Sequence, residues 1–470
     1  MSNLKQFIRL TTPLFVLGSI LLFQKNTIAI ECPCDIYEET GTPCVGAFST
    51  TRLLSSKYTG PIYQVRRADG QTKDIPQTDD GFADSKVQDD FLGNSGGTIS
   101  KLYDQSGKGN DLTVAKKGCF DGTASQDDNE SDAKGRKVMV GGHNVYALYM
   151  KQTEGYRSNQ EGYSGYPKQV DPANGMPKNN ENQGIYEVVD GKRYGTACCW
   201  NFGNGSTDNC YGPTGQMNTC FFGTAYWGRG AGSGPWFMND MEAGVWAGGS
   251  KPGDPGWGAL DAGGVRLPNN DNPSITWDYA MGISKTSTEN GQAKYCLRMG
   301  NAQSGNLVNA WDGNAPTAWK MEGGIILGIG GDNSNSSFGT FFEGCITAGR
   351  PSNETDAKIH QNIQNIGYGK NKVATLVIDN IVPLKSMFSV HNVPSTSSTA
   401  ISFTLTHAQQ VNMNVFDQQG RQIATIVSGI KAAGRHKSVW NTRQATPGVY
   451  VVKTSLDGKN RWTDKIVIGK

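Results

Sequence analysis

The sequence contains few histidines and few charged side chains for its length. Only five of its 470 residues are histidine, and three of them (His391, His407 and His436) lie in the last 80 residues. His143 and His360 remain upstream, which argues against a histidine-rich metal site or Ser-His-Asp chemistry there. Charged residues make up 18% of the chain, against about 25% in ordinary soluble proteins. The net charge of +2 provides no basic excess for binding nucleic acid.

Glycine is abundant instead, with 61 residues, about twice its average frequency. Between residues 30 and 368, short apolar runs such as GPIYQV, YALYM and GGIILGIGG alternate with clusters of Gly, Asn, Asp and Pro. This pattern predicts an all-β sandwich. One helix is expected, over Glu354–Ile366, with Asn353 or Thr355 as its cap. The stretches 121–134 and 156–183 are expected to be long surface loops.

The first 29 residues have the features of a secretory signal peptide. Lys5 and Arg9 precede the apolar run 13–23, and small residues at Thr27 and Ala29 suit a cleavage site. That run is shorter than the ~20 residues needed to cross a bilayer, so we expect no membrane span after cleavage. The mature protein is therefore expected outside the cytoplasm, as a secreted or cell-surface protein.

All ten cysteines follow the signal segment, and an even count in an exported chain predicts disulfides. No cysteine pair has the CxxC spacing of a zinc site. The adjacent Cys198 and Cys199 either bond to each other or pair elsewhere, and the spacing alone leaves both options open.

The charge changes sign near residues 370–388. From Lys385 onward there are eleven Lys and Arg against three Asp, whereas residues 30–384 are acidic. We therefore expect a main domain at 30–370, a linker at 371–387 and a second domain at 388–470. The runs AISFTLT, QVNMNVFD, GVYVVKTS and DKIVIG predict strands in the second domain. Its motifs VFDQQGRQI and PGVYVVK resemble the Ig-like C-terminal modules, FlgD-like or sorting-type, of bacterial secreted enzymes. This resemblance implies that the second domain contacts export machinery or the cell surface; a polysaccharide-binding domain is the alternative.

The segment Trp236–Trp246, WFMNDMEAGVW, combines aromatic rings with carboxylates. If it is one strand, Asp240 and Glu242 lie on the same face as both tryptophans. Such a face suits a sugar site, because a ring packs on the CH face of a sugar while carboxylates bind hydroxyls or attack the anomeric carbon. The alternative is an exposed acidic strand flanked by packing aromatics.

The segment Gly323–Asn335, GGIILGIGGDNSN, places Asp332 at the end of a buried strand. In a dinucleotide site a helix begins directly after the glycines, but here Ser and Asn residues follow them, which argues against such a site. An EF-hand loop starting at Asp332 would have Ser337 where glycine is required, which argues against calcium. A glycosidase needs two carboxyl groups facing each other across the scissile bond, and Asp240, Glu242 and Asp332 are the best placed.

Six motifs in the same order resemble the catalytic domain of the α-L-arabinofuranosidases of glycoside hydrolase family 54, over about Cys34 to Gly367. They are PCDIYEETGTPCVGAFSTTR, GPIYQVRR, YDQSGKGNDL, GTACCWNFGN, GPWFMNDMEAG and GGIILGIGGDNSNSSFGTFFEG. The resemblance implies a jelly-roll or concanavalin-like β-sandwich, retention of anomeric configuration, and no metal or organic cofactor. It also implies that the chain acts on arabinose-containing plant cell-wall polysaccharides.

The resemblance also implies roles for individual residues. Glu242 matches the nucleophile and Asp332 the general acid/base. Ala243 stands where fungal members typically have an Asn that contacts the sugar. The remaining sugar contacts are matched by Asp240, Gly244, Gly331, Trp227 and the vicinal disulfide Cys198–Cys199.

The resemblance further implies a Cys34–Cys44 disulfide. The family's second disulfide has no counterpart here, so the other cysteines need other partners. We predict Cys210–Cys220 within one loop and Cys296–Cys345 between strands.

The function implied is that of a secreted retaining α-L-arabinofuranosidase that removes terminal arabinofuranosyl residues from arabinoxylan or arabinan. One alternative is another furanosidase, or a xylosidase, using the same site. A second is a non-catalytic sugar-binding protein. The presence of both Glu242 and Asp332 argues against the second, because a lectin needs no acid/base pair.

Overall fold

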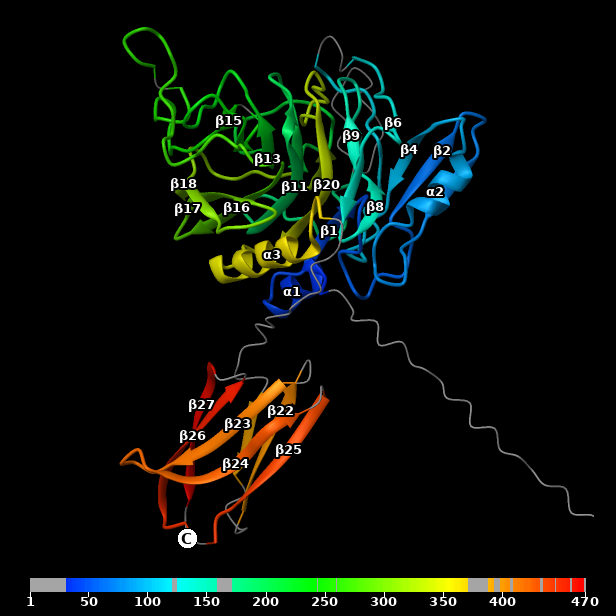
Figure 1. The fold of residues 1–470 in the computed structure, drawn as a ribbon. Helices are drawn as coiled ribbons and strands as arrows, with labels where there is room; N and C mark the ends of the chain where they lie inside the picture. The colour runs from blue at the N-terminus through cyan, green and yellow to red at the C-terminus, as the bar shows by residue number, and fades with distance from the viewer. Residues whose placement is uncertain are drawn as a thin grey trace, which may run out of the picture. The chain divides into compact units, whose positions relative to one another are not determined.

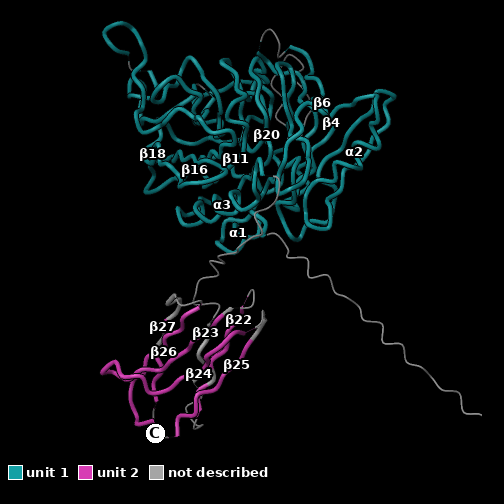
Figure 2. Tube along the Cα trace, in the orientation of Figure 1, with its two compact units in different colours: residues 1–373 teal, residues 374–470 magenta. Residues whose placement is uncertain are grey.

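The chain divides into two compact units, residues 1–373 and residues 374–470 (Figure 2). The computed structural model describes residues 31–120, 125–158, 171–242, 244–258, 260–370, 388–392, 398–405, 409–431, 434–443, 445–456 and 459–468. The predicted signal peptide (1–29), the predicted linker (371–387) and Ala243 lie outside these residues. Among the described residues, no helix is both long enough and apolar enough to cross a membrane.

The first unit is a sandwich of two antiparallel sheets (Figure 1). One sheet has seven strands in the order β1-β20-β11-β16-β17-β18, with β9 also paired to β20. Their bounds are β1 (Cys44–Ser49), β9 (Leu148–Met150), β11 (Gln183–Tyr194), β16 (Tyr279–Glu289), β17 (Gln292–Asn301), β18 (Val308–Asn314) and β20 (Gly339–Ala348).

The other sheet has eleven strands in the order β15-β14-β13-β12-β19-β10-β5-β4-β2-β3, with β6 paired to β4. Their bounds are β2 (Tyr63–Arg67), β3 (Thr72–Ile75), β4 (Gly97–Leu102), β5 (Leu112–Val114), β6 (Ser131–Asp132), β10 (Tyr156–Arg157), β12 (Asn201–Gly205), β13 (Asn218–Gly223), β14 (Trp236–Asp240), β15 (Val245–Trp246) and β19 (Gly324–Leu327). A small separate hairpin is formed by β7 (Lys137–Val140) and β8 (His143–Tyr146).

The core of the first unit lies between the two sheets. Phe202 of β12 contacts Phe341 of β20, with 5.3 Å between ring centroids. Gly282 of β16 faces Phe237 of β14, and a Cβ at position 282 would overlap that ring. Glycine is therefore required there, because it allows the opposing strand to come close enough for the ring to pack.

Helix α3 (Asn353–Ile366) covers the outer face of the seven-stranded sheet, and it confirms the helix predicted over Glu354–Ile366. Its cap is Ser352, just before the predicted candidates, whose Oγ accepts a hydrogen bond from the N–H of Thr355 at 3.1 Å. The helix is fixed to the sheet by buried ion pairs: Asp356 lies 2.6 Å from Lys285 of β16 and 2.7 Å from Arg298 of β17. The other two helices described are α1 (Pro33–Glu39) and α2 (Ser85–Leu92).

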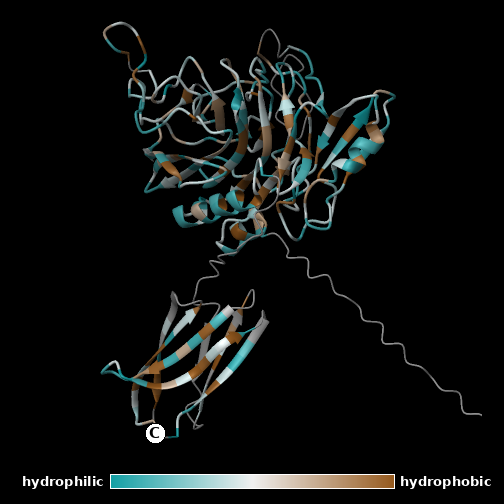
Figure 3. Cartoon of the chain, viewed as in Figure 1, coloured by the Kyte–Doolittle hydropathy of each residue, from teal (hydrophilic) through white to brown (hydrophobic). Residues whose placement is uncertain are grey.

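The second unit is a smaller β-sandwich with its own core. A three-stranded sheet, β21-β22-β25, and a four-stranded sheet, β24-β23-β26-β27, enclose an apolar cluster that includes Val411, Met413 and Val415. Buried and partly exposed residues alternate along β23, and Figure 3 shows the same alternation of apolar and polar residues on neighbouring strands. The four predicted strands are confirmed. The bounds are β21 (Phe388–Asn392), β22 (Ser398–Leu405), β23 (Gln409–Phe416), β24 (Gln422–Lys431), β25 (Gly434–Asn441), β26 (Gly448–Leu456) and β27 (Lys459–Ile468).

The disulfides agree with the predictions only in part. Cys34 bonds to Cys44 and Cys198 bonds to Cys199, as expected. The prediction of Cys210–Cys220 is wrong, since Cys210 bonds to Cys119. The Cys220 side chain lies in the core between the sheets. Cys210 lies in a loop next to the one that contains Cys119, and the Cys119 N–H donates a hydrogen bond to the Asn209 carbonyl at 2.9 Å.

The prediction of Cys296–Cys345 is also wrong, and neither residue forms a disulfide. Cys296 lies on β17 and Cys345 on β20, with β11 and β16 between them in the sheet. Three strand spacings amount to about 14 Å. A disulfide requires Cα atoms within about 7 Å, so these two cysteines cannot reach each other.

Candidate active site

The carboxylates of WFMNDMEAGVW lie on a hairpin, and the prediction of a single strand is wrong. β14 and β15 pair antiparallel, with Asn239 opposite Trp246. The chain reverses between them because Glu242 and Gly244 have positive φ angles of 83° and 117°. Trp246 consequently leaves the carboxylate face and stacks on Trp257, with 4.3 Å between ring centroids.

Glu242 occupies the turn of this hairpin, in a crowded position. Its backbone N–H donates to Oδ1 of Asp240 at 3.0 Å. Its Oε2 is buried and accepts no hydrogen bond from the described residues. A Cβ at position 331 would lie 2.6 Å from this oxygen, so Gly331 leaves the space in front of it open. Gly244 is covered by Trp257, whose Nε1 would lie 2.6 Å from a Cβ there.

The Glu242 carboxyl group lies in a strongly acidic environment. Burial raises its pKa well above the usual range, and the nearby Asp240 and Asp332 carboxylates raise it further. The N–H of Gly212, hydrogen-bonded to the carboxylate, and the charge of Arg157 act in the opposite direction. The ionisation of Glu242 therefore depends on the charges of the acidic groups around it.

Asp240 ends β14 and is almost fully buried. Its Oδ2 accepts a hydrogen bond from Nδ2 of Asn201 at 2.9 Å. Burial raises the pKa of Asp240 to about 7, against the hydrogen bonds from Asn201 and the Glu242 N–H, and with a smaller increase from Asp332. This group therefore changes charge near neutral pH.

The vicinal disulfide lies beside these carboxylates. The two sulfur atoms and a carboxylate oxygen of Asp240 all lie within 4.8 Å of one another. Because both sulfurs are in a disulfide, they are not thiolate ligands for a metal. Oγ of Ser334 lies 3.7 Å from Sγ of Cys198 and 3.4 Å from Sγ of Cys199. The disulfide thus connects the Asp240 hairpin to the loop that contains Asp332.

Asp332 lies on the loop that follows β19, and its neighbours hold this loop in place. Its Oδ1 accepts a hydrogen bond from the Ser334 N–H at 2.9 Å. Just before it, the Gly331 carbonyl accepts from Oγ of Ser206 at 2.7 Å and from Nη1 of Arg157 at 3.1 Å. Gly118 packs directly on the Asp332 carbonyl oxygen, which a Cβ at position 118 would overlap.

Two residues of this site were not identified from the sequence, and both lie in segments expected to be surface loops. Arg157 is fully buried on β10, between β5 and β19, so the loop prediction for 156–183 is wrong at its start. Asp128 is also buried, and its Oδ1 accepts hydrogen bonds from Nδ2 of Asn333, at 3.1 Å, and of Asn335. The sequence signal for these two residues was the polar run DNSN, because its side chains need hydrogen-bond partners if the loop is buried.

The predicted aromatic residue Trp227 is partly exposed, with 37% of its surface accessible. The next residue, Gly228, packs against the Val245 carbonyl of β15, so Trp227 lies next to the hairpin that bears Glu242. Of the predicted site residues, Ala243 alone lies outside the described residues. The structure brings the others together from the segments 198–199, 227–244 and 331–332.

Comparison with known proteins identifies both units of the chain. Residues 33–369 match the family model described as alpha-L-arabinofuranosidase B, catalytic. Residues 390–469 match the model of a secretion system C-terminal sorting domain, which indicates secretion.

Several curated and solved proteins are similar to the first unit. Alpha-L-arabinofuranosidase B of Aspergillus oryzae is 40% identical over 341 residues, which cover 70% of this chain and 61% of that protein. The arabinofuranosidase/B-xylosidase of Trichoderma koningii is 39% identical over 339 residues, covering 70% and 62%. The chain thus spans about six-tenths of the length of these curated relatives.

A crystal structure of an arabinofuranosidase complexed with arabinofuranosyl-alpha-1,2-xylobiose aligns with a TM-score of 0.64 at 33% identity. The alignment covers 86% of this chain and 74% of that one.

Proposed function

Since the chain belongs to the α-L-arabinofuranosidase B catalytic family, glycoside hydrolase family 54, we propose that it is a secreted retaining α-L-arabinofuranosidase. Its substrates are terminal arabinofuranosyl residues on arabinoxylan or arabinan. The observation that carries the proposal is the convergence of Glu242, Asp240 and Asp332 around the vicinal disulfide. A sugar-binding protein without activity would not need this coupled set of carboxyl groups.

In the proposed mechanism Glu242 is the nucleophile and Asp332 the general acid/base. Oε2 of Glu242, buried and without a hydrogen-bond donor among the described residues, attacks the anomeric carbon. Asp332 gives its proton to the leaving glycosidic oxygen, so that a covalent glycosyl-enzyme forms. Asp332 then removes a proton from water, which attacks the same carbon, and Glu242 leaves with retained configuration.

The remaining predicted residues bind the arabinofuranose in this proposal. Asp240 accepts hydrogen bonds from sugar hydroxyls, and the Cys198–Cys199 disulfide packs against the ring. Gly331 leaves the space in front of Glu242 open to the sugar, Gly244 lets the hairpin turn beneath Trp257, and Trp227 offers an aromatic face. Ala243 provides no hydrogen bond, which distinguishes this chain from family members with Asn there.

We assign the chain a catalytic domain at 30–370, a linker at 371–387 and a sorting domain at 388–470. The compact unit ending at residue 373 and the sorting-domain match over 390–469 support this assignment. The second unit then contacts export machinery or the cell surface, while the first contacts arabinose-containing polysaccharide.

The test is hydrolysis of p-nitrophenyl α-L-arabinofuranoside by the mature protein and by Glu242→Gln and Asp332→Asn. We expect loss of at least about a thousandfold in kcat for Glu242→Gln, because the covalent step disappears. Asp332→Asn should lose less with this activated leaving group than with arabinoxylan, since nitrophenolate needs little protonation. Full turnover by Glu242→Gln would refute its role as nucleophile.

The alternative substrates are tested in the same assay. The name of the Trichoderma koningii relative makes p-nitrophenyl β-D-xyloside the relevant comparison. Preference for the xyloside would replace arabinofuranosidase activity with xylosidase activity. Sugar binding without turnover of either substrate would favour the non-catalytic sugar-binding protein.

A further inference from the structure

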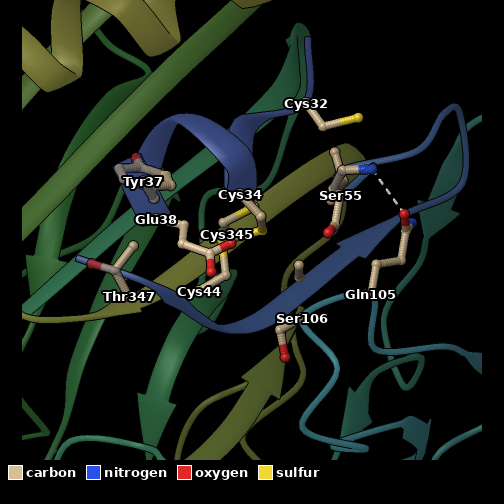
Figure 4. Close-up of a disulfide and its surroundings, with 12 residues drawn as sticks. Cys32, Cys34, Tyr37, Glu38, Cys44, Ser55, Gln105, Ser106, Cys345 and Thr347 are labelled. Atoms are coloured by element: carbon tan, nitrogen blue, oxygen red, sulfur yellow. Dashed lines mark hydrogen bonds between the residues drawn. A yellow bond between two sulfur atoms is a disulfide. The ribbon is translucent and has the colours of Figure 1, made fainter. Parts of the chain in front are cut away.

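Three sulfur atoms from three elements meet beside α1. The Cys34–Cys44 disulfide joins α1 to the start of β1, with a Cα–Cα distance of 5.5 Å. Cys345 of β20 forms no disulfide, and its Sγ lies 3.7 Å from Sγ of Cys34. All three sulfurs lie within 4.8 Å of one another. Figure 4 shows the three cysteines together. A thiol is therefore in contact with a disulfide.

Strand pairing holds this arrangement in place. β1 pairs with β20, with Ala47 opposite Cys345, so the thiol lies on the strand next to the one that Cys44 begins. The Cys345 side chain is completely buried, and its S–H donates to the Tyr186 hydroxyl at 3.5 Å. Because core packing rather than a flexible loop sets the distance, the thiol stays within reach of the disulfide.

The disulfide also borders a cavity of about 330 Å³. Cys34 and Cys44 line this cavity together with Lys57 and Lys108. Glu38 also lines it and is paired with Lys57 at 2.6 Å. A thiol released here would be accessible to small reagents that enter the cavity.

We propose that these three cysteines form a thiol–disulfide exchange site that releases Cys44 into the cavity as a modifiable thiol. The Cys345 thiolate attacks Sγ of Cys34, and the Cys34–Cys345 bond forms as the Cys34–Cys44 bond breaks. Cys44 leaves with the electron pair of the broken bond and takes up the proton that Cys345 lost. The exchange is balanced within the protein and needs no external oxidant or reductant. The released thiol then reacts with small electrophiles or disulfides that enter the cavity.

The exchange should accelerate as the pH rises, because only the thiolate attacks. Burial raises the pKa of the Cys345 thiol well above its usual range. The hydrogen bond with Tyr186 and the charge of Arg52 lower it, whereas Glu343 and Asp104 raise it. At neutral pH the thiol form dominates, so the native Cys34–Cys44 bond persists for long periods.

The exchanged bond would constrain the chain much more than the native one. The native bond links residues 10 positions apart, whereas Cys34 and Cys345 are 311 positions apart. A cross-link that closes a longer loop removes more conformational freedom from the unfolded chain. The exchanged form should therefore unfold at a higher denaturant concentration than the native form.

The experiment is disulfide mapping of the full-length mature protein, incubated without reductant at about pH 7 and about pH 9. Iodoacetamide is present throughout, and non-reduced peptides are identified by mass spectrometry. We expect a Cys34–Cys345 peptide together with carbamidomethylated Cys44, formed about tenfold faster per pH unit, in proportion to the thiolate fraction. An intact Cys34–Cys44 peptide with unmodified Cys44 at both pH values would overturn the proposal.

Two variants separate local exchange from general unfolding. Cys345→Ser removes the attacking thiol and should leave Cys44 unmodified at both pH values. Cys296→Ser is the matched control, since Cys296 is also buried on the same sheet but lies beside Asn309, with 3.8 Å from its Sγ to Oδ1. It should behave as the wild type. Cross-links to Cys220 or Cys296 appearing with those to Cys345 would indicate unfolding and refute exchange at this site. If Cys345→Ser does not fold, the mapping of the wild-type chain still decides.

Discussion

At the scale of single residues, the site is organised by interactions between carboxyl groups. Burial and neighbouring carboxylates raise the pKa values of Glu242 and Asp240, that of Asp240 to about 7. A nucleophilic carboxylate must be ionised before it can attack. The acidic limit of activity should therefore report the titration of this coupled set.

Asp240→Asn should move the acidic limb of the pH profile of kcat/KM to lower pH. The ionised Asp240 raises the pKa of Glu242, so a neutral amide lets Glu242 ionise at lower pH. Total activity should also fall, because a proposed sugar contact changes. Asp261→Asn, in an exposed loop, serves as the control and should leave the limb in place. A limb that stays in place in Asp240→Asn would contradict this coupling.

Asp128→Ala should reduce kcat by about ten- to a hundredfold with a smaller change in KM. Removing this carboxylate leaves Asn333 and Asn335 without their shared acceptor, so the loop loses the geometry that orients Asp332. Asp128→Asn, which keeps one acceptor oxygen, should recover part of the loss. If both variants lose the same kcat and the same thermal stability, Asp128 has a purely structural role.

At the scale of secondary-structure elements, α3 is attached to the sheet by charge as well as by apolar contact. Asp356 is buried between Lys285 and Arg298, so its loss would leave two cations without their partner. Unpaired buried charge is more costly than the net contribution of an intact pair. The helix and sheet should therefore separate readily once this carboxylate is removed.

Asp356→Asn should destabilise the first unit by about 3 kcal/mol, measured by urea unfolding followed by tryptophan fluorescence. Glu354→Gln provides the comparison, since Glu354 is exposed in the first turn of the same helix and should cost less than about 1 kcal/mol. A similar small effect for both would mean that solvent screens the Asp356 ion pairs.

At the scale of the whole molecule, the two units have separate cores and separate roles in the proposed function. All the predicted site residues lie in the first unit, and the sorting-domain match lies in the second. Activity and destination should therefore be separable by truncation.

A chain that ends at residue 373 should retain the kcat/KM of the full chain for the nitrophenyl substrate, since every site contact lies before that position. In the cells that produce the protein, however, the truncated chain should remain within the cell envelope instead of reaching the cell surface or the medium. Cell fractionation with activity measurement checks both statements. A large drop in kcat/KM would show that the second unit contributes to the site.

Much of this protein follows from local sequence. The alternation of apolar and polar residues determined the strands of the second unit, and the apolar spacing of ETDAKIHQNIQNI determined α3. The motifs NDMEAG and GIGGDNSN marked Glu242, Asp240 and Asp332 as the best-placed carboxylates, and the resemblance to the family implied their roles, which remain predictions. The change in net charge near residue 370 predicted the boundary between the two units.

Other features depended on the tertiary structure. The sequence of WFMNDMEAGVW is compatible with one strand, and only the positive φ angles of Glu242 and Gly244 turn it into a hairpin. Cysteine pairing depends on the order of strands in a sheet, which separates Cys296 from Cys345 by two strands and places Cys345 beside Cys34. Arg157 and Asp128 support the Asp332 loop from distant parts of the chain. Local propensity carries no information about which distant segments become neighbours, because long-range packing alone makes that choice.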